Sequence, residues 1–457
     1  MTICCPVTQE PEPVSTANIA KNSLKIALLG CGNVGAEVAR ILLDDAAMLT
    51  RRSGTDLELI GIAVRTVDAP RTVELPAELF TTDASGLIAR ADLVIELMGG
   101  IEPARTLIRE AITQGASVVT GNKALLAVHG PELYQLASEN AVQLSYEAAV
   151  AGAIPILRPI RDSLAGDTIT RVLGIVNGTT NYILDQMDTT GADFAAALAE
   201  AQRLGYAEAD PTADVQGHDA AAKAAILASL SFHTDVALDQ VHCEGIAEIT
   251  SADIEAARES GLVIKLLAIA ERLQDEEGER INVRVHPTLL PRSHPLAAVH
   301  GAFNAVFVEA ENAGELMFYG QGAGGRPTAS AVMGDVVSAA RRIVLGGPGR
   351  TETASGHLPA ADIKTVRTSY SVGLEVSDEA GVLAQIAGIF AHHGASIETL
   401  RQTLRPVSDP ASDTQPSAEL RIVTHRASES ALAATVAEVR ALPVVKAVTS
   451  VLRVEGI

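Results

Sequence analysis

The sequence predicts an α/β protein of three successive parts: a doubly wound parallel sheet in residues 23–150, a mixed α+β region in 151–345, and a small βαββαβ module in 368–457. Strand-like apolar runs alternate with amphipathic helices in the first part, which is typical of parallel sheets. This alternation stops in the second part, where strands and helices form a less regular pattern. A segment rich in Gly, Pro and Ser, residues 346–367, reads as a linker before the third part.

Composition narrows the class of protein. A chain of 457 residues that is 47% hydrophobic can form several cores without disulfides or metals. Its formal charge of −21 repels nucleic acids, so small molecules are the expected partners. Residues 1–22 lack the basic start and apolar centre of a signal peptide and are expected to form a disordered tail. No apolar run is long enough to span a membrane. Four cysteines without metal-ligand spacing fit a reduced cytoplasmic protein without a zinc site.

A glycine-rich turn gives the first functional signal. In "LKIALLGCGNVGAEVARILL", residues 24–43, an apolar strand enters the pattern GxGxxG and leaves it as an amphipathic helix. This context is the fingerprint of a Rossmann-type dinucleotide-binding domain. The first glycine permits a tight turn, the second lets the backbone approach the pyrophosphate, and the third allows the helix to pack closely on the strand. The residues expected to contact the cofactor here are Gly30, Gly32, Asn33, Val34 and Gly35.

Three further positions follow the later strands of this sheet. Arg65 stands at the end of "LELIGIAVRT", where NAD-binding proteins carry an acidic residue, and an arginine suits the 2′-phosphate of NADP. NADP(H) is therefore the preferred cofactor and NAD(H) a possible one, although Arg65 also fits a solvated surface charge. Gly99 ends the strand "ADLVIELMGG", where a cofactor could lie against backbone. Lys123, in "TGNKA", falls at the carboxyl end of a strand, where ligands of such sheets collect.

An unusual acidic stretch precedes one lysine. "GYAEADPTADVQGHDAAAKAA", residues 205–225, places four carboxylates before Lys223 at the start of an apolar helix. Polar capping of the helix and an i,i+4 ion pair between Asp219 and Lys223 would be the ordinary explanation. However, the sequence "AAILASLSF" after Lys223 predicts a largely buried helix, and a buried lysine needs a partner or a function.

These motifs together resemble one enzyme family. "GCGNVG", "TGNKALLA", "YEAAVAGAIPI", "VNGTTNYIL", "GYAEADPTADVQGHDAAAKAAILA" and "GQGAGGRPTASAVMGD" are similar, in order and context, to those of homoserine dehydrogenases over residues 25–345. The resemblance implies NAD(P)H-dependent reduction of L-aspartate 4-semialdehyde to L-homoserine, on the route to threonine, methionine and isoleucine.

The resemblance also implies roles for the charged residues. Glu208 and Asp214 match positions that bind the amino-acid substrate, and Lys223 matches the proton donor. Asp219, one helical turn before Lys223, would keep its ammonium charged in a desolvated pocket. Lys123 matches a second active-site lysine between cofactor and substrate.

The remaining implied positions are backbone contacts. Gly205 and Gly322 match contacts to the nicotinamide cofactor, although turn geometry alone could explain either glycine. A site for a monovalent cation, expected to be Na⁺, is implied at Glu147, Val150, Gly152 and Ile154. Asp210 matches no such role and is interpreted as a loop or capping residue.

The third part resembles an ACT domain, a ferredoxin-like module that binds amino acids, commonly between paired copies. The resemblance rests on "LEVSDEAGVLAQIAGIFAHHGASIETLRQ", and its inserted loop, residues 406–417, is polar. Its place after a complete catalytic region predicts regulation, with threonine as the effector, in a homodimer or homotetramer. A dimerisation tail that binds nothing is the alternative for this domain.

Two other functions stay open at this point. One is a non-catalytic, amino-acid-sensing protein that keeps a nucleotide fold, which would not need Lys223 and its carboxylates. The other is oxidation of the semialdehyde through a thioester, which needs a nucleophilic cysteine. Cys31 lies in the phosphate turn and Cys243 has no base nearby in sequence, so this second alternative is weak.

Overall fold

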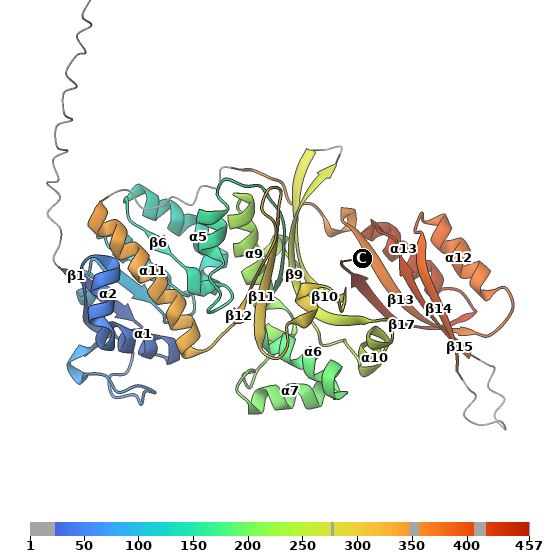
Figure 1. The fold of residues 1–457 in the computed structure, drawn as a ribbon, viewed down its shortest axis with the longest axis horizontal. Helices are drawn as coiled ribbons and strands as arrows, with labels where there is room; N and C mark the ends of the chain where they lie inside the picture. The colour runs from blue at the N-terminus through green and yellow to red at the C-terminus, as the bar shows by residue number, and fades with distance from the viewer. Residues whose placement is uncertain (1–22, 276–277, 347–355, 406–416, 457) are drawn as a thin grey trace, which may run out of the picture.

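The computed structural model describes residues 23–275, 278–346, 356–405 and 417–456, and its three parts follow one another in a row (Figure 1). The predicted N-terminal tail, most of the polar loop after residue 405 and part of the predicted linker lie outside the described residues. Within these, no helix combines the length and the apolar character that a membrane crossing requires.

The first part is a six-stranded parallel sheet in the order β3-β2-β1-β4-β5-β6. Chain order reverses beside β1, so the predicted doubly wound sheet is confirmed, with its switch point between β1 and β4. Its strands are β1 (Ser23–Leu29), β2 (Asp56–Ala63), β3 (Phe80–Thr81), β4 (Leu93–Glu96), β5 (Ser117–Thr120) and β6 (Leu144–Ser145). Its helices are α1 (Asn33–Asp44), α2 (Ala46–Ser53), η1 (Ala77–Leu79), α3 (Ala84–Ile88), α4 (Ala104–Thr113) and α5 (Lys123–Glu139).

Alternation along β1 explains why helices cover both faces of this sheet. Ile26 and Leu28 belong to the cluster formed with α1, whereas Ala27 and Leu29 belong to the cluster formed with α3, α4 and α5. A strand that is buried on both faces must be apolar at nearly every position, as "KIALLG" is.

A helix from the far end of the catalytic region completes the first core. α11 (Gly325–Leu345) contributes Ala329, Val332 and Val336 to the same cluster as Ile26, and it lies beside α1 in Figure 1. The sequence predicts that α11 belongs to the second part, residues 151–345. Its amphipathic pattern shows that one face is buried but does not show which sheet that face covers. The chain therefore crosses between the first two parts twice.

The second part contains a long mixed sheet covered mainly on one face. Its strands are β7 (Ile169–Ile175), β8 (His242–Cys243), β9 (Leu262–Asp275), β10 (Gly278–Pro291), β11 (Phe303–Ala310) and β12 (Gly314–Gln321). Its helices are η2 (Glu147–Ala149), η3 (Pro159–Ser163), α6 (Gly178–Thr190), α7 (Phe194–Arg203), α8 (Thr212–Val215), α9 (His218–Phe232), η4 (Leu238–Gln240), α10 (Ser251–Glu259) and η5 (Pro295–Ala298). α9 and α6 pack on the face that carries Val172, Val306 and Val308.

The third part has the predicted βαββαβ order. Its elements are η6 (Ile363–Thr365), β13 (Arg367–Ser377), α12 (Val382–His392), β14 (Ile397–Arg405), β15 (Ser417–Thr424), β16 (Ala427–Ser428), α13 (Glu429–Arg440) and β17 (Val445–Val454). The four main strands lie in the order β17-β13-β15-β14, and the helices pack on one face of the sheet.

The module is not tethered by its linker alone. β17 pairs in parallel with β10, at Thr288↔Arg453 and Leu289↔Val454, so both sheets form one sheet of eleven strands. The second half of the predicted linker also lies on β10, because Ile281 N donates to Pro359 O at 3.0 Å and Ala361 N donates to Ile281 O at 2.7 Å. This pairing covers part of the edge of β10, which would otherwise expose unpaired backbone groups.

Candidate active site

The glycine-rich turn has the shape that a dinucleotide requires. Gly30 has a φ of 94°, and a Cβ there would lie 2.7 Å from Leu97 O. A Cβ on Gly35 would lie 2.3 Å from Gly30 O, so helix and turn are in backbone contact. In contrast, no described atom lies within 4 Å of a Cβ built on Gly32. The turn is therefore closed against the sheet and open where a pyrophosphate would approach the start of α1.

The neighbouring strand ends are fixed by a buried carboxylate. Glu96 is fully buried, and its Oε1 accepts hydrogen bonds from Met98 N at 2.8 Å and Gly99 N at 3.3 Å. Gly99 itself is exposed with a φ of 72°, which favours glycine. Asn122 caps α5 and donates to Gly100 O at 2.6 Å, which joins this turn to the start of the Lys123 helix.

One carboxylate joins the two predicted lysines across the two domains. Asp219 Oδ2 lies 2.7 Å from Lys223 Nζ, and its Oδ1 lies 2.5 Å from Lys123 Nζ. Lys223 also donates to Val176 O at 2.7 Å. Asp219 and Lys223 are buried, whereas the Lys123 side chain is 44% exposed. The first residue of α5 in the nucleotide domain and the first turns of α9 in the second domain thus form one ionic cluster.

The cluster keeps Asp219 ionised. Burial opposes its charge, but the attraction of Lys223 and Lys123 is stronger and holds the pKa of this carboxyl well below its usual range. An anion shared by two ammonium groups leaves the cluster with a net positive charge. Such a site attracts the electron-rich oxygen of a carbonyl or carboxylate.

Asn177 is a site residue that sequence reasoning missed. Its Nδ2 lies 2.7 Å from Asp214 Oδ1 and 2.8 Å from Asp219 Oδ2, and its Oδ1 caps α6 by accepting from Thr180 N. The Asn before the helix in "VNGTTNYIL" is an ordinary capping signal, and capping does not predict contact with a distant acidic stretch. Asn177 holds Asp214 and Asp219 in one group.

The other two acidic residues, Glu208 and Asp210, are exposed and do not contact the ionic cluster. Glu208 is exposed in the loop after α7, and its carboxylate has no hydrogen bond or ion pair with the described residues. Asp210 accepts from Thr212 N at 3.1 Å and from its hydroxyl at 2.6 Å, which confirms the interpretation of Asp210 as a loop or capping residue.

Two arginines follow β2. Arg65 is exposed directly after the strand. Arg71, which sequence reasoning missed, donates to the carbonyls of Thr66, Val67 and Ala69, and its guanidinium lies 3.9 Å from the centre of the Phe80 ring. Its charge also reaches the glycine-rich turn, because it partly offsets the effect of burial on Cys31. Positive charge therefore gathers at the end of β2.

Neither described thiol is prepared for nucleophilic attack. Burial raises the pKa of both Cys31 and Cys243, and the Cys243 thiol donates to Gln216 O at 3.3 Å. A thioester route needs a thiolate, so these environments oppose the oxidative alternative.

The remaining predicted glycines have structural explanations. Gly205 ends α7 with a φ of 78° and open surroundings. Gly322 lies directly on the amide of Asn304, since a Cβ there would be 2.2 Å from Asn304 Cγ. Its carbonyl oxygen would be 2.3 Å from a Cβ on Gly152, so the loop after β12 packs on the loop of the predicted cation site.

The carboxylate of Glu147 does not fit a cation ligand. Its Oε1 accepts from Leu157 N at 2.8 Å, and its Oε2 accepts from Arg158 N at 2.9 Å and Arg158 Nε at 3.1 Å. A cation beside this guanidinium would be repelled. The oxygen donors that remain in the predicted set are the carbonyls of Val150, Gly152 and Ile154.

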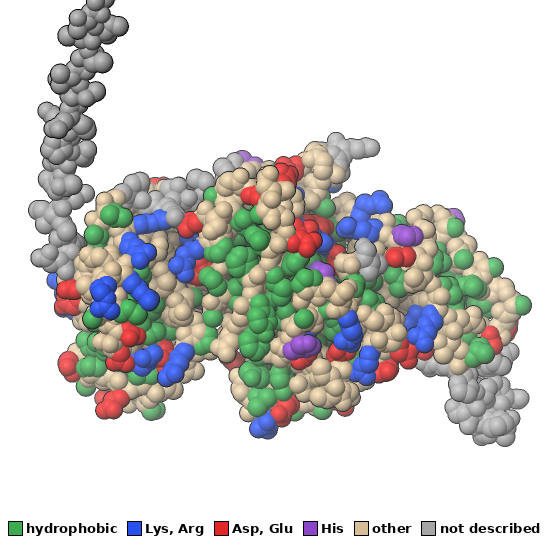
Figure 2. All heavy atoms as spheres, in the orientation of Figure 1, with side chains coloured by type: hydrophobic (Ala, Val, Ile, Leu, Met, Phe, Trp, Pro, Cys, Tyr) green, Lys and Arg blue, Asp and Glu red, His purple; other side chains and the backbone are tan. Residues whose placement is uncertain are grey.

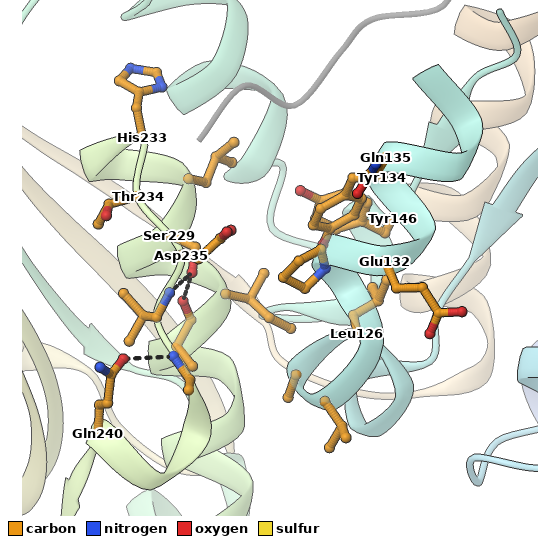
Figure 3. Close-up of a pocket in the computed structure, with 18 of the residues that line it drawn as sticks. Leu126, Glu132, Tyr134, Gln135, Tyr146, Ser229, His233, Thr234, Asp235 and Gln240 are labelled. Carbon is orange, nitrogen blue, oxygen red and sulfur yellow. Dashed lines mark hydrogen bonds between the residues drawn. The ribbon is translucent and has the colours of Figure 1, made fainter. Parts of the chain in front are cut away.

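A cavity of about 750 Å³ lies beside the active site rather than in it. It separates the later turns of α5 and α9, with Tyr134 and Tyr146 on one side and Ser229 and Asp235 on the other (Figure 3). None of the predicted site residues lines it. The cavity therefore lies between α5 of the first part and α9 of the second, away from the ionic cluster.

A dinucleotide turn, a shared Lys–Asp–Lys cluster and an amino-acid-binding type of module define a nicotinamide-dependent oxidoreductase of amino-acid metabolism. Family models agree: homoserine dehydrogenase matches residues 155–337, the homoserine dehydrogenase NAD binding domain matches 30–147, and the ACT domain matches 370–444. The chain belongs to the homoserine dehydrogenase family.

Relatives and solved structures support this assignment over nearly the whole chain. Homoserine dehydrogenase of Corynebacterium glutamicum is 55% identical over 437 residues, which cover 95% of this chain and 96% of that protein. A crystal structure of a homoserine dehydrogenase from Thiobacillus denitrificans is 37% identical with a TM-score of 0.85, covering 95% of this chain and 98% of that one. A hyperthermophilic archaeal homoserine dehydrogenase in complex with NADPH is 27% identical with a TM-score of 0.60, covering 72% of this chain and 100% of that one.

Proposed function

We propose that Lys223 donates the proton in the reduction of L-aspartate 4-semialdehyde to L-homoserine. The observation that carries this role is the buried Lys223 ammonium, which donates to Asp219 at 2.7 Å and to Val176 O at 2.7 Å. An ammonium group has three donors, so one N–H remains for the aldehyde oxygen of the substrate. NADPH, when bound, supplies the hydride to the carbonyl carbon. The proton from Lys223 then neutralises the developing alkoxide.

The other charged residues orient the substrate. Asp219 orients the ammonium of Lys223 through their 2.7 Å contact. Lys123, whose ammonium is partly exposed beside Asp219, holds an oxygen of the substrate on the side of the nucleotide domain. Asp214 has one oxygen engaged by Asn177, and its second oxygen is available to the ammonium of the substrate, as is the exposed carboxylate of Glu208.

The preferred cofactor is proposed to be NADPH, with NADH as a poorer alternative. Arg65 and Arg71 provide positive charge after β2, where the adenosine ribose of a dinucleotide binds in this fold. The archaeal relative was solved in complex with NADPH, which supports this cofactor for the fold. A guanidinium binds a 2′-phosphate through charge-assisted hydrogen bonds that a ribose hydroxyl cannot match.

The C-terminal module is proposed to bind threonine and to slow the enzyme. Its last strand offers a route to the active site: the guanidinium of Arg453 binds both carboxylate oxygens of Glu244, at 2.7 and 2.9 Å. Glu244 follows β8, and a Cβ on Gly217 would be 3.3 Å from Glu244 O. Gly217 caps α9, which carries Asp219 and Lys223. A shift of the module would therefore reach α9 through packed groups.

A homo-oligomer is proposed from the free edge of the long sheet. Hydrophobic side chains gather over the centre of the face in Figure 2, in the region of β11 and β12. On edge strand β12 and its neighbour, Met317 and Tyr319 are 37% and 55% exposed, and Phe303 stacks on Tyr319 with ring centres 5.2 Å apart. An exposed apolar edge of this kind favours pairing with a second copy.

Consumption of NADPH tests the enzymatic proposal. We expect absorbance at the reduced nicotinamide to fall when L-aspartate 4-semialdehyde is added, and to fall more slowly with NADH at equal concentration. Absence of turnover with both cofactors, in a folded protein that still binds NADPH, would instead support an amino-acid-sensing role.

A further inference from the structure

Asn304 has a buried amide without a partner. The residue lies at the start of β11 and is 1% exposed. Neither its Nδ2 nor its Oδ1 has a hydrogen-bond partner among the residues that the structure describes. By comparison, the equally buried Asn181 donates to the carbonyls of Val299, Gly301 and Phe303. A buried amide with both atoms unpaired is costly, and it persists where function requires it.

Asn304 faces the active site along the strand. Side chains on β11 alternate, so Asn304 shares a face with Val306 and Val308, the face on which α9 and α6 pack. Its neighbour Ala305 pairs with Ile175, the last residue of β7. Val176, whose carbonyl binds Lys223, follows directly. Asn304 therefore lies at the strand ends that surround the proton donor.

The cofactor-binding turn lies on the other side of this amide. Gly322 covers the amide with its Cα, and its loop continues to Gly325 at the start of α11. A Cβ on Gly325 would be 3.0 Å from Asn33 O in the glycine-rich turn. A dinucleotide whose pyrophosphate lies at that turn must pass the Gly322 loop before its nicotinamide reaches Lys223. Asn304 is thus on the path of the nicotinamide end.

The two unpaired atoms limit the chemistry of the ligand group. A carboxylate would satisfy Nδ2 but repel Oδ1, and an ammonium would satisfy Oδ1 alone. A primary carboxamide offers an acceptor and a donor side by side and satisfies both. We propose that Asn304 recognises the carboxamide of the nicotinamide cofactor; this inference rests on the proposed function. Gly322 and Gly178 both lie against this amide, and because neither carries a side chain, a backbone movement of the Gly322 loop would open it.

Asn304→Leu separates this role from a structural one. Leucine is close in size and removes both unpaired atoms, so we expect the ligand-free variant to unfold at a higher temperature than the parent. The control Asn181→Leu removes an amide that is fully paired, and it should unfold at a lower temperature. We also expect the dissociation constant of NADPH, measured by its fluorescence, to rise about tenfold in Asn304→Leu. Binding of 2′-phospho-ADP-ribose, which lacks the nicotinamide, should change less than about twofold.

A cofactor analogue tests the proposal independently of folding in this variant. 3-Acetylpyridine adenine dinucleotide phosphate replaces the amide NH₂ by a methyl group. The parent should bind its reduced form several-fold more weakly than NADPH, whereas Asn304→Ala should bind the two equally. Equal discrimination by parent and Asn304→Ala, or equal weakening of NADPH and 2′-phospho-ADP-ribose in Asn304→Leu, would overturn the assignment. If the parent itself bound no NADPH, the proposed function would fail rather than the role of Asn304.

Discussion

Replacing Glu455 by glutamine tests whether the last residues of the chain belong to the core of the catalytic region. Glu455 Oε1 lies 3.2 Å from Arg284 Nη2, and its Oε2 lies 2.7 Å from Arg171 Nη2. The Arg284 and Glu455 side chains are 1% and 5% exposed, so water screens this pair little. Glu271 is the second carboxylate of the cluster, at 2.8 Å from Arg284 Nη1. In the variant, the buried Arg284 and the partly buried Arg171 share mainly the carboxylate of Glu271.

The magnitude follows from the charge that is left uncompensated. Removing one member of a buried ion pair costs about 3–5 kcal/mol. Glutamine keeps one hydrogen-bond acceptor and Glu271 stays in place, so we expect a loss near the lower end, about 3 kcal/mol. Glu200→Gln is the matched control, since Glu200 pairs with Arg203 on the surface and its loss should not measurably change stability.

Urea unfolding of parent and variants at several pH values measures this loss. Burial opposes the charge of Glu455, but Arg171 and Arg284 outweigh it and keep its pKa below the usual value. A carboxyl with a lowered folded-state pKa stabilises the protein above its unfolded-state pKa, about 4.3, and this contribution is lost as pH falls through the folded-state pKa. The difference between parent and Glu455→Gln should therefore be full at pH 7 and shrink below about pH 4. A difference below about 1 kcal/mol at pH 7, or one that does not depend on pH, would refute the charge argument.

Three other substitutions test the site and its regulation. In steady-state kinetics, Lys223→Ala should lower kcat about 100- to 10,000-fold with little change in NADPH binding. A rate within a few-fold of the parent would mean that the proton comes from Lys123 or water. Arg65→Ala should raise the KM for NADPH about tenfold and that for NADH much less, whereas equal changes would show that Arg65 does not bind the 2′-phosphate. Glu244→Gln should weaken inhibition by threonine while kcat without threonine stays within about twofold, because it removes the charge that binds Arg453 and leaves the Arg453–Glu429 pair in place. Glu259→Gln, at a surface pair with Arg401, is the control. Unchanged inhibition would exclude the Arg453–Glu244 contact as the route.

Local patterns in the sequence were enough to predict the nucleotide-binding turn and the helix that carries Lys223. GxGxxG between a strand and a helix fixes its own geometry, and the i,i+4 spacing of Asp219 and Lys223 brings their charged groups together on one helix. Lys123 is different, because its distance from Asp219 depends on how two domains pack. Only the family resemblance placed it in the same site.

The amides show where sequence reasoning stops. The sequence predicts that Asn177 caps a helix, and it does. Its side-chain Nδ2, however, also donates to Asp214 and Asp219, about 40 positions further along the chain. Asn304 carried a usable signal, since in "FNAVFVEA" it begins a run of five residues that are all buried, where a polar residue is unusual. Its lack of a partner is a property of the packed structure and has no sequence pattern.

The sheet shared by the catalytic region and the ACT domain decides how regulation can be tested. A chain that ends near residue 350 would lose β17 from the edge of β10 and Glu455 from the buried arginines. Loss of a threonine response in such a chain would then report on a damaged catalytic core as much as on a missing effector site. A single change at Glu244 leaves the β17–β10 backbone pairing, Glu455 and the pair of Arg453 with the buried Glu429 in place, and it removes the charge that binds Arg453 from the catalytic region. Because Glu244 O lies against Gly217 at the start of the Lys223 helix, this contact is where a movement of the module would first reach the proton donor.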